Sequence, residues 1–320
     1  MRLNVMMILA GLAGSGLVLA AEPEAPAEEG GGFQMPPAEL IGELTKRLLD
    51  DPDGRMADLG KRLLGERGGD MLFYIPTRDE PQTPADLGLN FEEVRFASKD
   101  GTKLHGWLIP AKGEKAKATI VFSHGNAGSI GHHLPFVAWL PEEGFNVFIY
   151  DYRGYGKSEG KVDRKGMTED AAAAFRAAAE REEVDEGKLL SLAHSLGGAK
   201  SVAGLAADRP AGLRGVVVIS SFASYSAMAR IWGGNVGAQL TNDEFAAGGL
   251  IGKLEGVPVL IMHGDADEVI PFDEGRVLAA AAREPKEFWA VPGGRHSDLL
   301  LRDDGKWRKK MLAWMNARVE

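Results

Sequence analysis

From about Met71 onward, short apolar runs alternate with longer stretches of helical periodicity. Several runs are almost entirely apolar, which is typical of parallel strands covered by helices on both faces. The predicted strands span residues 93–97, 104–109, 118–123, 146–150, 189–193, 215–219, 257–262 and 287–291. The predicted helices span residues 134–141, 167–182, 197–208, 274–282 and 304–317. This order predicts an α/β fold built on one mostly parallel eight-stranded sheet.

The first two predicted strands are joined by a short turn that contains Lys99-Asp100-Gly101. Asp-Gly between two such runs is a β-hairpin signal, because both residues tolerate the backbone angles of a tight turn. We therefore expect the sheet to start with an antiparallel pair and to continue with parallel βαβ units. No internal repeat is visible in the sequence.

The first residues have the composition of a secretory signal. Arg2 gives a positive start, residues 5–19 carry no charge, and Val18-Leu19-Ala20 resembles a signal-peptidase site. We expect residues 1–21 to form a signal peptide that is cleaved after Ala20 or Ala21. The protein would then be exported to the periplasm or secreted, with no stable membrane insertion. The alternative is an uncleaved membrane anchor, although the run is short for a spanning helix and is interrupted by glycines.

The rest of the chain divides by composition. Residues 22–36 are rich in Pro, Glu, Ala and Gly and predict a flexible linker. Residues 37–70 have helical spacing that is broken at Asp51-Pro52-Asp53-Gly54, so we expect a helical N-terminal extension of two helices. Residues 71–320 form the predicted catalytic domain.

Charge and composition exclude several classes of function. The formal net charge is −9, and no long basic run offsets it, so we expect no nucleic-acid partner. The chain has no cysteine, which excludes disulfides, thiolate nucleophiles and cysteine-ligated metals. The pair His132-His133 has no carboxylate at ligand spacing, so we expect no metal there. The sequence does not predict an oligomeric state.

The stretch Ala193-His194-Ser195-Leu196-Gly197 joins a predicted strand to a predicted helix. Small residues on either side of a serine allow the sharp, strained turn that exposes its hydroxyl at the edge of a sheet. Ser195 is therefore the candidate nucleophile. The alternative is a serine that only caps the following helix.

A serine nucleophile needs a base, and the base needs an acid that orients it. In this architecture the chain order is serine, acid, histidine, each after a later strand. The last predicted strand ends close to His296, which is the candidate base. Three acids follow the strand before it and compete for the third role: Asp265, Asp267 and Glu268.

Two backbone N–H groups would form an oxyanion hole. One belongs to Leu196, directly after the nucleophile, and the other candidate is Asn126 in the loop after strand 118–123. His124 is expected to brace this loop. The segment from Asp151 to Ser158 contains Gly-Lys-Ser but fails the phosphate-loop pattern, because Asp151 stands where that pattern needs glycine.

Together these residues resemble the α/β-hydrolase superfamily, and within it the small-lid serine hydrolases related to the α/β-hydrolase-domain depalmitoylases and their bacterial relatives. The matching segments are His124-Gly-Asn-Ala-Gly, Asp151-Tyr-Arg-Gly-Tyr-Gly-Lys-Ser, Ala193-His-Ser-Leu-Gly-Gly, His263-Gly with Asp267 and Val-Ile-Pro271, and Gly294-Arg-His296. The resemblance covers residues 71–317 and implies acyl transfer without a cofactor. It also implies that the acid is Asp267, and we expect Glu268 to point away as a surface charge.

The expected function is hydrolysis of a small-molecule carboxylic ester or thioester through an acyl-enzyme. Residues 220–255 leave room for only a short lid, where Phe222 and Tyr225 are candidate substrate-binding residues, although they could equally pack a helix. Two alternatives remain open: a serine peptidase or amidase of the same fold, and a binding protein that has kept the fold without catalysis.

Overall fold

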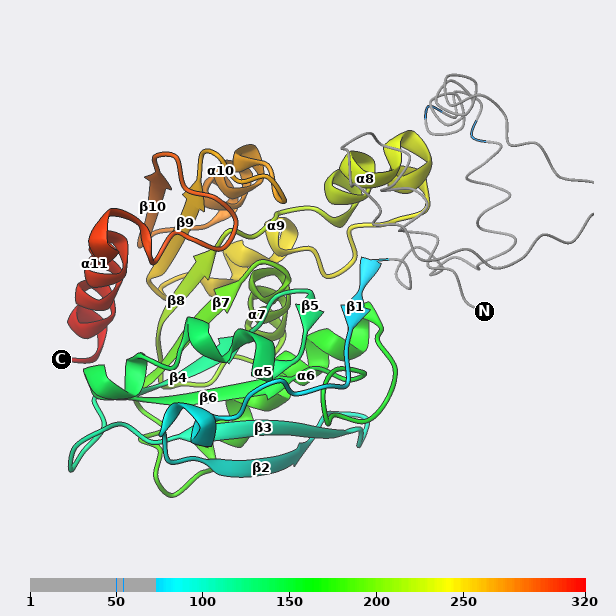
Figure 1. Ribbon diagram of the computed structural model, residues 1–320. Coiled ribbons are helices and arrows are strands. Elements are labelled where there is room, and N and C mark those ends of the chain that lie inside the picture. The colour runs from blue at the N-terminus through cyan, green and yellow to red at the C-terminus, as the bar shows by residue number, and fades with distance from the viewer. Residues whose placement is uncertain (1–49, 51–53, 55–72) are drawn as a thin grey trace, which may run out of the picture. The chain divides into compact units, whose positions relative to one another are not determined.

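The computed structural model describes residues 50, 54 and 73–320 (Figure 1). The predicted signal peptide (1–21) and linker (22–36) lie outside the described residues, as does nearly all of the predicted helical extension (37–70). Phe73–Tyr225 and Asp243–Glu320 form one compact unit, whereas Ser226–Asn242 belongs to a second unit. The fold below is that of the first unit, which begins two residues after the expected start of the catalytic domain.

An eight-stranded sheet with the order β10-β9-β8-β7-β4-β6-β3-β2 forms the centre of this unit (Figure 1). Its strands are β2 (Glu92–Ala97), β3 (Lys103–Ile109), β4 (Ala118–Ser123), β6 (Phe145–Asp151), β7 (Leu189–His194), β8 (Leu213–Ile219), β9 (Val259–Gly264) and β10 (Lys286–Val291). β3 pairs antiparallel with β2 and with β6, and the remaining neighbours are parallel. The predicted fold class, including the antiparallel start, is confirmed.

Helices cover both faces of the sheet. The α-helices are α5 (Ile130–His133), α6 (Arg164–Ala179), α7 (Leu196–Ala207), α9 (Ala247–Leu250), α10 (Phe272–Ala281) and α11 (Arg302–Val319). Two short 3₁₀ turns, η1 (Pro84–Leu87) and η4 (Ile251–Leu254), lie in connecting segments. α8 (Tyr225–Gln239) begins at the last residue before the second unit and loses helical geometry at Gly233 and Gly234. In the described chain, none of the helices has the length and apolar character that a bilayer crossing requires.

Several predicted boundaries differ from those of the structure, and prolines explain two of the differences. The helix predicted at 134–141 is instead two 3₁₀ turns, η2 (Leu134–Phe136) and η3 (Leu140–Glu143), each with a proline in its first positions. Pro135 and Pro141 cannot donate a backbone hydrogen bond, so one continuous α-helix cannot run through both. The strand predicted at 257–262 begins at Val259 and ends at Gly264, because Pro258 cannot donate to the ladder.

A second, two-stranded sheet was not predicted. β1 (Ile75–Pro76) pairs in parallel with β5 (Ala127–Gly128), which follows the end of β4. Both strands have only two residues, so no periodic pattern marks them. The pairing attaches the segment before the main sheet to the loop that was predicted to supply an oxyanion donor.

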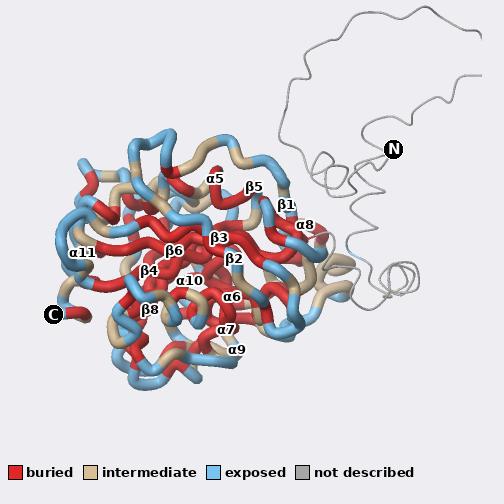
Figure 2. The backbone as a smooth tube through the Cα atoms, turned by 90° about the horizontal axis from the view of Figure 1, so that it is seen from below, coloured by how far each residue is buried: buried red, intermediate tan, exposed pale blue. Residues whose placement is uncertain are grey.

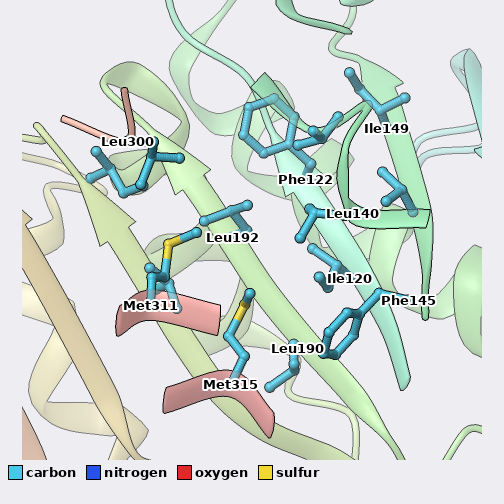
Figure 3. Packing of buried hydrophobic residues seen from close by; sticks show 14 of the residues in the cluster. Ile120, Phe122, Leu140, Phe145, Ile149, Leu190, Leu192, Leu300, Met311 and Met315 are labelled. Atoms are coloured by element: carbon cyan, nitrogen blue, oxygen red, sulfur yellow. The ribbon is translucent and has the colours of Figure 1, made fainter. Parts of the chain in front are cut away.

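One face of the sheet packs against α11. Along β4 and β7, alternate side chains point to this face, as the pleat of a strand requires, and α11 adds two methionines. The residues of this cluster that Figure 3 labels in these three elements are Ile120, Phe122, Leu190, Leu192, Met311 and Met315. All of them are buried, and the buried stretches of the backbone are concentrated in the central strands (Figure 2). The ends of the central strands are therefore positioned by a tightly packed hydrophobic core.

Arg153, in the loop after β6, is buried and joins three separate segments. Its guanidinium donates to Asp170 of α6 at 2.8 Å and to Asp100 of the β2–β3 turn at 2.8 Å. It also donates to Ser98 Oγ at 3.1 Å. These contacts hold the loop after β6 against α6 and the β2–β3 turn.

Removing Arg153 should leave the buried Asp170 carboxylate without its cation. Because an unpaired buried charge is costly, Arg153→Ala should lower the free energy of unfolding by about 3–5 kcal/mol. Arg276 also pairs with a carboxylate, that of Asp273, but both side chains are exposed. Arg276→Ala should therefore change stability by less than about 0.5 kcal/mol. Urea unfolding of both variants measures the difference, and equal losses would contradict the assignment.

Candidate active site

Ser195 lies at the junction of β7 and α7 in a strained backbone conformation. Its φ and ψ are 56° and −124°, a region that residues other than glycine rarely adopt. Its N–H donates to the carbonyl of Ile219 at 2.9 Å, which anchors the turn to the end of β8. The predicted sharp turn is therefore present at the carboxyl edge of the sheet.

The glycine after this turn is required by close packing. A Cβ atom on Gly197 would lie 1.9 Å from the carbonyl oxygen of Ser123, at the end of β4. Since real Cβ atoms do not approach backbone oxygens so closely, α7 can begin at this place only with glycine at position 197. The small residue in the motif thus sets how near α7 lies to β4.

The structure brings the three predicted side chains into one hydrogen-bonded path. His296 Nε2 lies 3.0 Å from Ser195 Oγ. His296 Nδ1 lies 2.9 Å from Asp267 Oδ2 and 3.1 Å from Oδ1. Ser195 follows β7, Asp267 follows β9 and His296 follows β10, so parallel strands carry all three residues to the same edge of the sheet.

The carboxylate of Asp267 is buried and well supplied with donors. The N–H groups of Val269 and Ile270 both donate to Oδ1 at 2.9 Å, and His263 Nε2 lies 3.3 Å from Oδ2. Burial alone would raise the pKa of Asp267, but hydrogen bonds from His263, His296 and Ile270 outweigh burial and hold the pKa well below its ordinary value. Asp267 therefore stays ionised and can orient the His296 ring.

The other acids near this site have different positions. Asp265 Oδ1 accepts from Gly293 N–H at 2.6 Å, and Asp298 Oδ1 accepts from Arg295 N–H at 2.8 Å. Glu268 is an exposed surface charge, as expected, but it does not point away from the His296 loop. Its carboxylate pairs with Arg295 at 2.9 Å and also accepts from His296 N–H at 3.4 Å. These acids bind the loop that carries His296, because that loop exposes several N–H groups to them.

The sequence did not predict that His194 contacts His296. Its Nε2 lies 3.0 Å from the carbonyl oxygen of His296, and its ring packs against Phe136 with centroids 4.5 Å apart. Since a carbonyl only accepts, Nε2 carries the proton. Burial, aided by the charge of nearby His296, lowers the pKa of His194 to about 3, so the ring is neutral. His194, the residue directly before Ser195, is thereby bound to the backbone of His296.

The loop after β4 lies against Ser195. An ideal Cβ on Gly125 would be 3.5 Å from Ser195 Cβ. The side chain of Asn126 holds the loop from behind, because its amide donates to Phe73 O at 2.7 Å and its oxygen accepts from Ile75 N–H at 3.1 Å. No hydrogen bond from Asn126 N–H is found within the described chain, and Leu196 N–H, at the first position of α7, has no partner in its own helix.

His124 is fully buried behind this loop. Its Nδ1 lies 2.7 Å from the carbonyl of Gly125, and the hydroxyl of Tyr152 donates to His124 O at 3.1 Å. Burial holds the pKa of His124 well below its ordinary value. A neutral, buried ring with these contacts fits a bracing role rather than proton transfer.

Phe222 and Tyr225 lie in an aromatic cluster rather than on an open surface. Their ring centroids are 5.0 Å apart, and Phe73 contacts both, at 5.8 Å and 5.3 Å. Both side chains are buried, and the Arg164 guanidinium lies 3.9 Å from the Tyr225 ring centroid. These are the contacts expected of packed residues, the alternative that the sequence left open.

Known protein families and curated proteins include sequences similar to this chain. The family model for the S33 serine aminopeptidases matches residues 114–243, which include Ser195 but neither Asp267 nor His296. The uncharacterized protein YfhR of Escherichia coli O157:H7 is 39% identical over 225 residues, covering 69% of this chain and 79% of YfhR. The α/β-hydrolase domain-containing protein WAV2 of Arabidopsis thaliana is 32% identical over 252 residues, covering 72% and 82%.

Solved structures agree on the fold. The esterase Pf2001 of Pyrococcus furiosus has a TM-score of 0.66 at 17% identity, covering 78% of this chain and 99% of that one. Est1E of Butyrivibrio proteoclasticus, solved with ferulic acid bound, has a TM-score of 0.58 at 20% identity, with coverage of 71% and 99%. The chain belongs to the α/β-hydrolase superfamily, as its motifs predicted, and it is a hydrolase.

The neutral state of His194 predicts a pH dependence. Its pKa is about 3 in the fold and about 6.5 in the unfolded chain, so below pH 6.5 only the unfolded chain gains the proton. Stability should therefore fall as pH decreases from 6.5 toward 3, with a contribution from His194 of up to roughly 1.4 kcal/mol per pH unit. In His194→Gln, whose amide can still donate, the decrease in unfolding free energy between pH 7 and pH 5 should be smaller.

His132→Gln is the matched control, because the His132 side chain is 37% exposed. Its unfolding free energy should depend on pH as in the unmodified protein. Urea unfolding at pH 7, 6 and 5 compares the three proteins. Equal pH dependence in His194→Gln and the unmodified protein would show that His194 takes up its proton in both states.

Proposed function

We propose that this protein hydrolyses a carboxylic ester or thioester through an acyl-enzyme formed on Ser195. The observation that carries the proposal is the unbroken hydrogen-bonded path from Ser195 Oγ through the His296 ring to the Asp267 carboxylate. This is the arrangement by which a neutral imidazole activates a hydroxyl, with a carboxylate fixing the ring's tautomer and orientation.

In the first half of the reaction, His296 Nε2 takes the proton of Ser195 as Oγ attacks the carbonyl carbon of the substrate. The ionised carboxylate of Asp267 stabilises the imidazolium that forms. The N–H groups of Leu196 and Asn126 hold the oxyanion, each contributing about 3–4 kcal/mol to the transition state. The imidazolium then protonates the leaving alkoxide or thiolate, and the acyl group stays on Oγ.

In the second half, water attacks the acyl-enzyme while His296 Nε2 accepts its proton. The tetrahedral intermediate uses the same two N–H groups, and its collapse returns the proton to Ser195 Oγ and releases the acid. No step requires a cofactor. The strained backbone at Ser195 supports this cycle, because it keeps Oγ at the sheet edge in both halves.

An ester is favoured over a peptide by two observations. Proteins of similar fold include the esterases Pf2001 and Est1E, although this likeness concerns the fold alone. An aminopeptidase must also bind the free ammonium of its substrate. The carboxylate of Glu268, which contacts the His296 loop, is already paired with the Arg295 guanidinium and is therefore not free to bind such an ammonium. The S33 aminopeptidase family model nevertheless makes a peptidase the second candidate.

Ser195→Ala should reduce the turnover of p-nitrophenyl esters by about 10⁴- to 10⁶-fold, because it removes the nucleophile and leaves only binding and the oxyanion donors. Ser297→Ala is the matched control, since Ser297 is an exposed serine next to His296, and its activity should stay near that of the unmodified protein. Ser195→Ala should also lose labelling by a fluorophosphonate probe. Failure of the unmodified protein to react with the probe would instead favour a non-catalytic binding protein.

A panel of p-nitrophenyl esters of increasing acyl length, compared with aminoacyl p-nitroanilides, separates the two candidate activities. We expect kcat/KM for the best ester to exceed that for the best anilide by at least about 100-fold, equivalent to about 3 kcal/mol of transition-state binding. A preference for anilides with a free amino group would identify an aminopeptidase and overturn the ester assignment.

A further inference from the structure

A second cluster of ionisable residues lies outside the candidate active site. His105 of β3 and Asp151 of β6 are register partners on neighbouring strands, and Glu80 lies in the segment before η1. His105 Nδ1 is 3.5 Å from Glu80 Oε1 and 3.7 Å from Asp151 Oδ2. One potential ligand atom from each residue lies within 4.8 Å of the other two. The side chains of His105 and Asp151 are fully buried, and that of Glu80 is 9% exposed.

In both carboxylates, one oxygen is anchored and the other is not. Asp151 Oδ1 accepts from Ile130 N–H at 3.0 Å, and Glu80 Oε2 pairs with Lys157 Nζ at 2.8 Å. The other oxygens, Asp151 Oδ2 and Glu80 Oε1, have no hydrogen-bond partner within the described chain, and neither has His105 Nδ1. These are the three atoms that face one another. Buried polar atoms are costly without a partner, so this arrangement indicates a shared ligand.

The surroundings have two further features of a metal site. His105 Nε2 faces Glu93 Oε1 at 3.8 Å, and a metal-binding histidine ordinarily directs its second nitrogen toward a carboxylate. An ideal Cβ on Gly156 would lie 2.0 Å from Asp151 Oδ2, so glycine at this position leaves space beside that oxygen.

The charges around the cluster also favour a bound cation. The ion pairs within the described chain join the carboxylates of Glu80 and Glu93 to a single ammonium, that of Lys157. Within the described chain, the ion pairs of Asp151 are with two histidines, His105 and His124. Among the described residues, the buried Asp151 carboxylate therefore has no ion pair with a lysine or an arginine, and Glu80 shares its lysine with Glu93. A divalent cation would supply the missing positive charge.

We propose that Glu80, His105 and Asp151 bind a divalent cation of the zinc class through Glu80 Oε1, His105 Nδ1 and Asp151 Oδ2. In a tetrahedral zinc site, bonds of 2.0–2.2 Å put neighbouring donors about 3.4 Å apart, close to the observed separations. The imidazole nitrogen favours zinc over magnesium or calcium, which prefer oxygen ligands alone. A solvent molecule completes the tetrahedron. The ion has a structural role, because it ties the segment before η1 to β3 and β6.

The competing interpretation is a proton on His105 that bridges the same carboxylates. The two are distinguished in the untagged full-length protein after metal is removed with dipicolinate. One equivalent of ZnCl₂ should then stay bound through desalting, with about one zinc per chain by mass spectrometry. At 100-fold excess over Kd, zinc should raise Tm by about 5 °C or more. No retained zinc and an unchanged Tm would overturn the proposal.

Two variants locate the ion. Glu80→Gln keeps an oxygen for Lys157 but removes a charged ligand, so it should weaken zinc binding at least about tenfold and lose most of the Tm response. Glu92→Gln is the control, because Glu92 is an exposed carboxylate of β2 that pairs with Arg181, and it should bind zinc as the unmodified protein does. Wild-type zinc affinity in Glu80→Gln would place the ion elsewhere and contradict the proposed ligands.

A measurement on the unmodified chain does not depend on the folding of any variant. Co²⁺ bound in place of zinc should give the intense visible absorption of a tetrahedral site with nitrogen and oxygen ligands. A weak octahedral spectrum would overturn the proposed geometry. The triad residues Ser195, Asp267 and His296 are not in this cluster, so esterase activity and zinc binding can fail independently.

Discussion

The strained backbone of Ser195 is the constraint on which the rest of the site depends. A residue with φ of 56° and ψ of −124° persists only where its surroundings hold it, and here β8 accepts its N–H while α7 begins directly after it. Glycine at position 197 allows α7 to approach β4 closely enough for this turn. The buried central strands supply the rigidity, because their side chains are packed from both faces.

The loops that meet Ser195 are held by polar contacts between one another rather than by apolar packing. His194 donates to the carbonyl of His296, and Glu268 accepts from the N–H of the same residue. Asn126 joins the opposite loop to the segment that contains β1. Because each contact fixes a backbone group, the loops hold the side chains of Ser195, Asp267 and His296 in the geometry that the proposed mechanism needs.

The same segment before the main sheet serves two sites. Its Phe73 and Ile75 hold the loop after β4 through Asn126, and its Glu80 reaches the buried histidine of β3. The proposed cation would therefore stabilise a segment that also supports the candidate oxyanion loop. This would explain why Asp151, at the end of a central strand, anchors Ile130 with one oxygen and faces His105 with the other.

The α/β fold, the antiparallel start and the order of serine, acid and histidine could be predicted from sequence, because strand periodicity and the residues that end each strand are local patterns. The choice among Asp265, Asp267 and Glu268 needed a family resemblance, since three acids within four positions have the same local signal. Only the tertiary structure turned Glu268 toward the His296 loop, packed Phe222 and Tyr225 into an aromatic cluster and brought His105 together with Glu80 and Asp151. These contacts join residues far apart in the chain or depend on loop conformation, and neither leaves a periodic trace in the sequence.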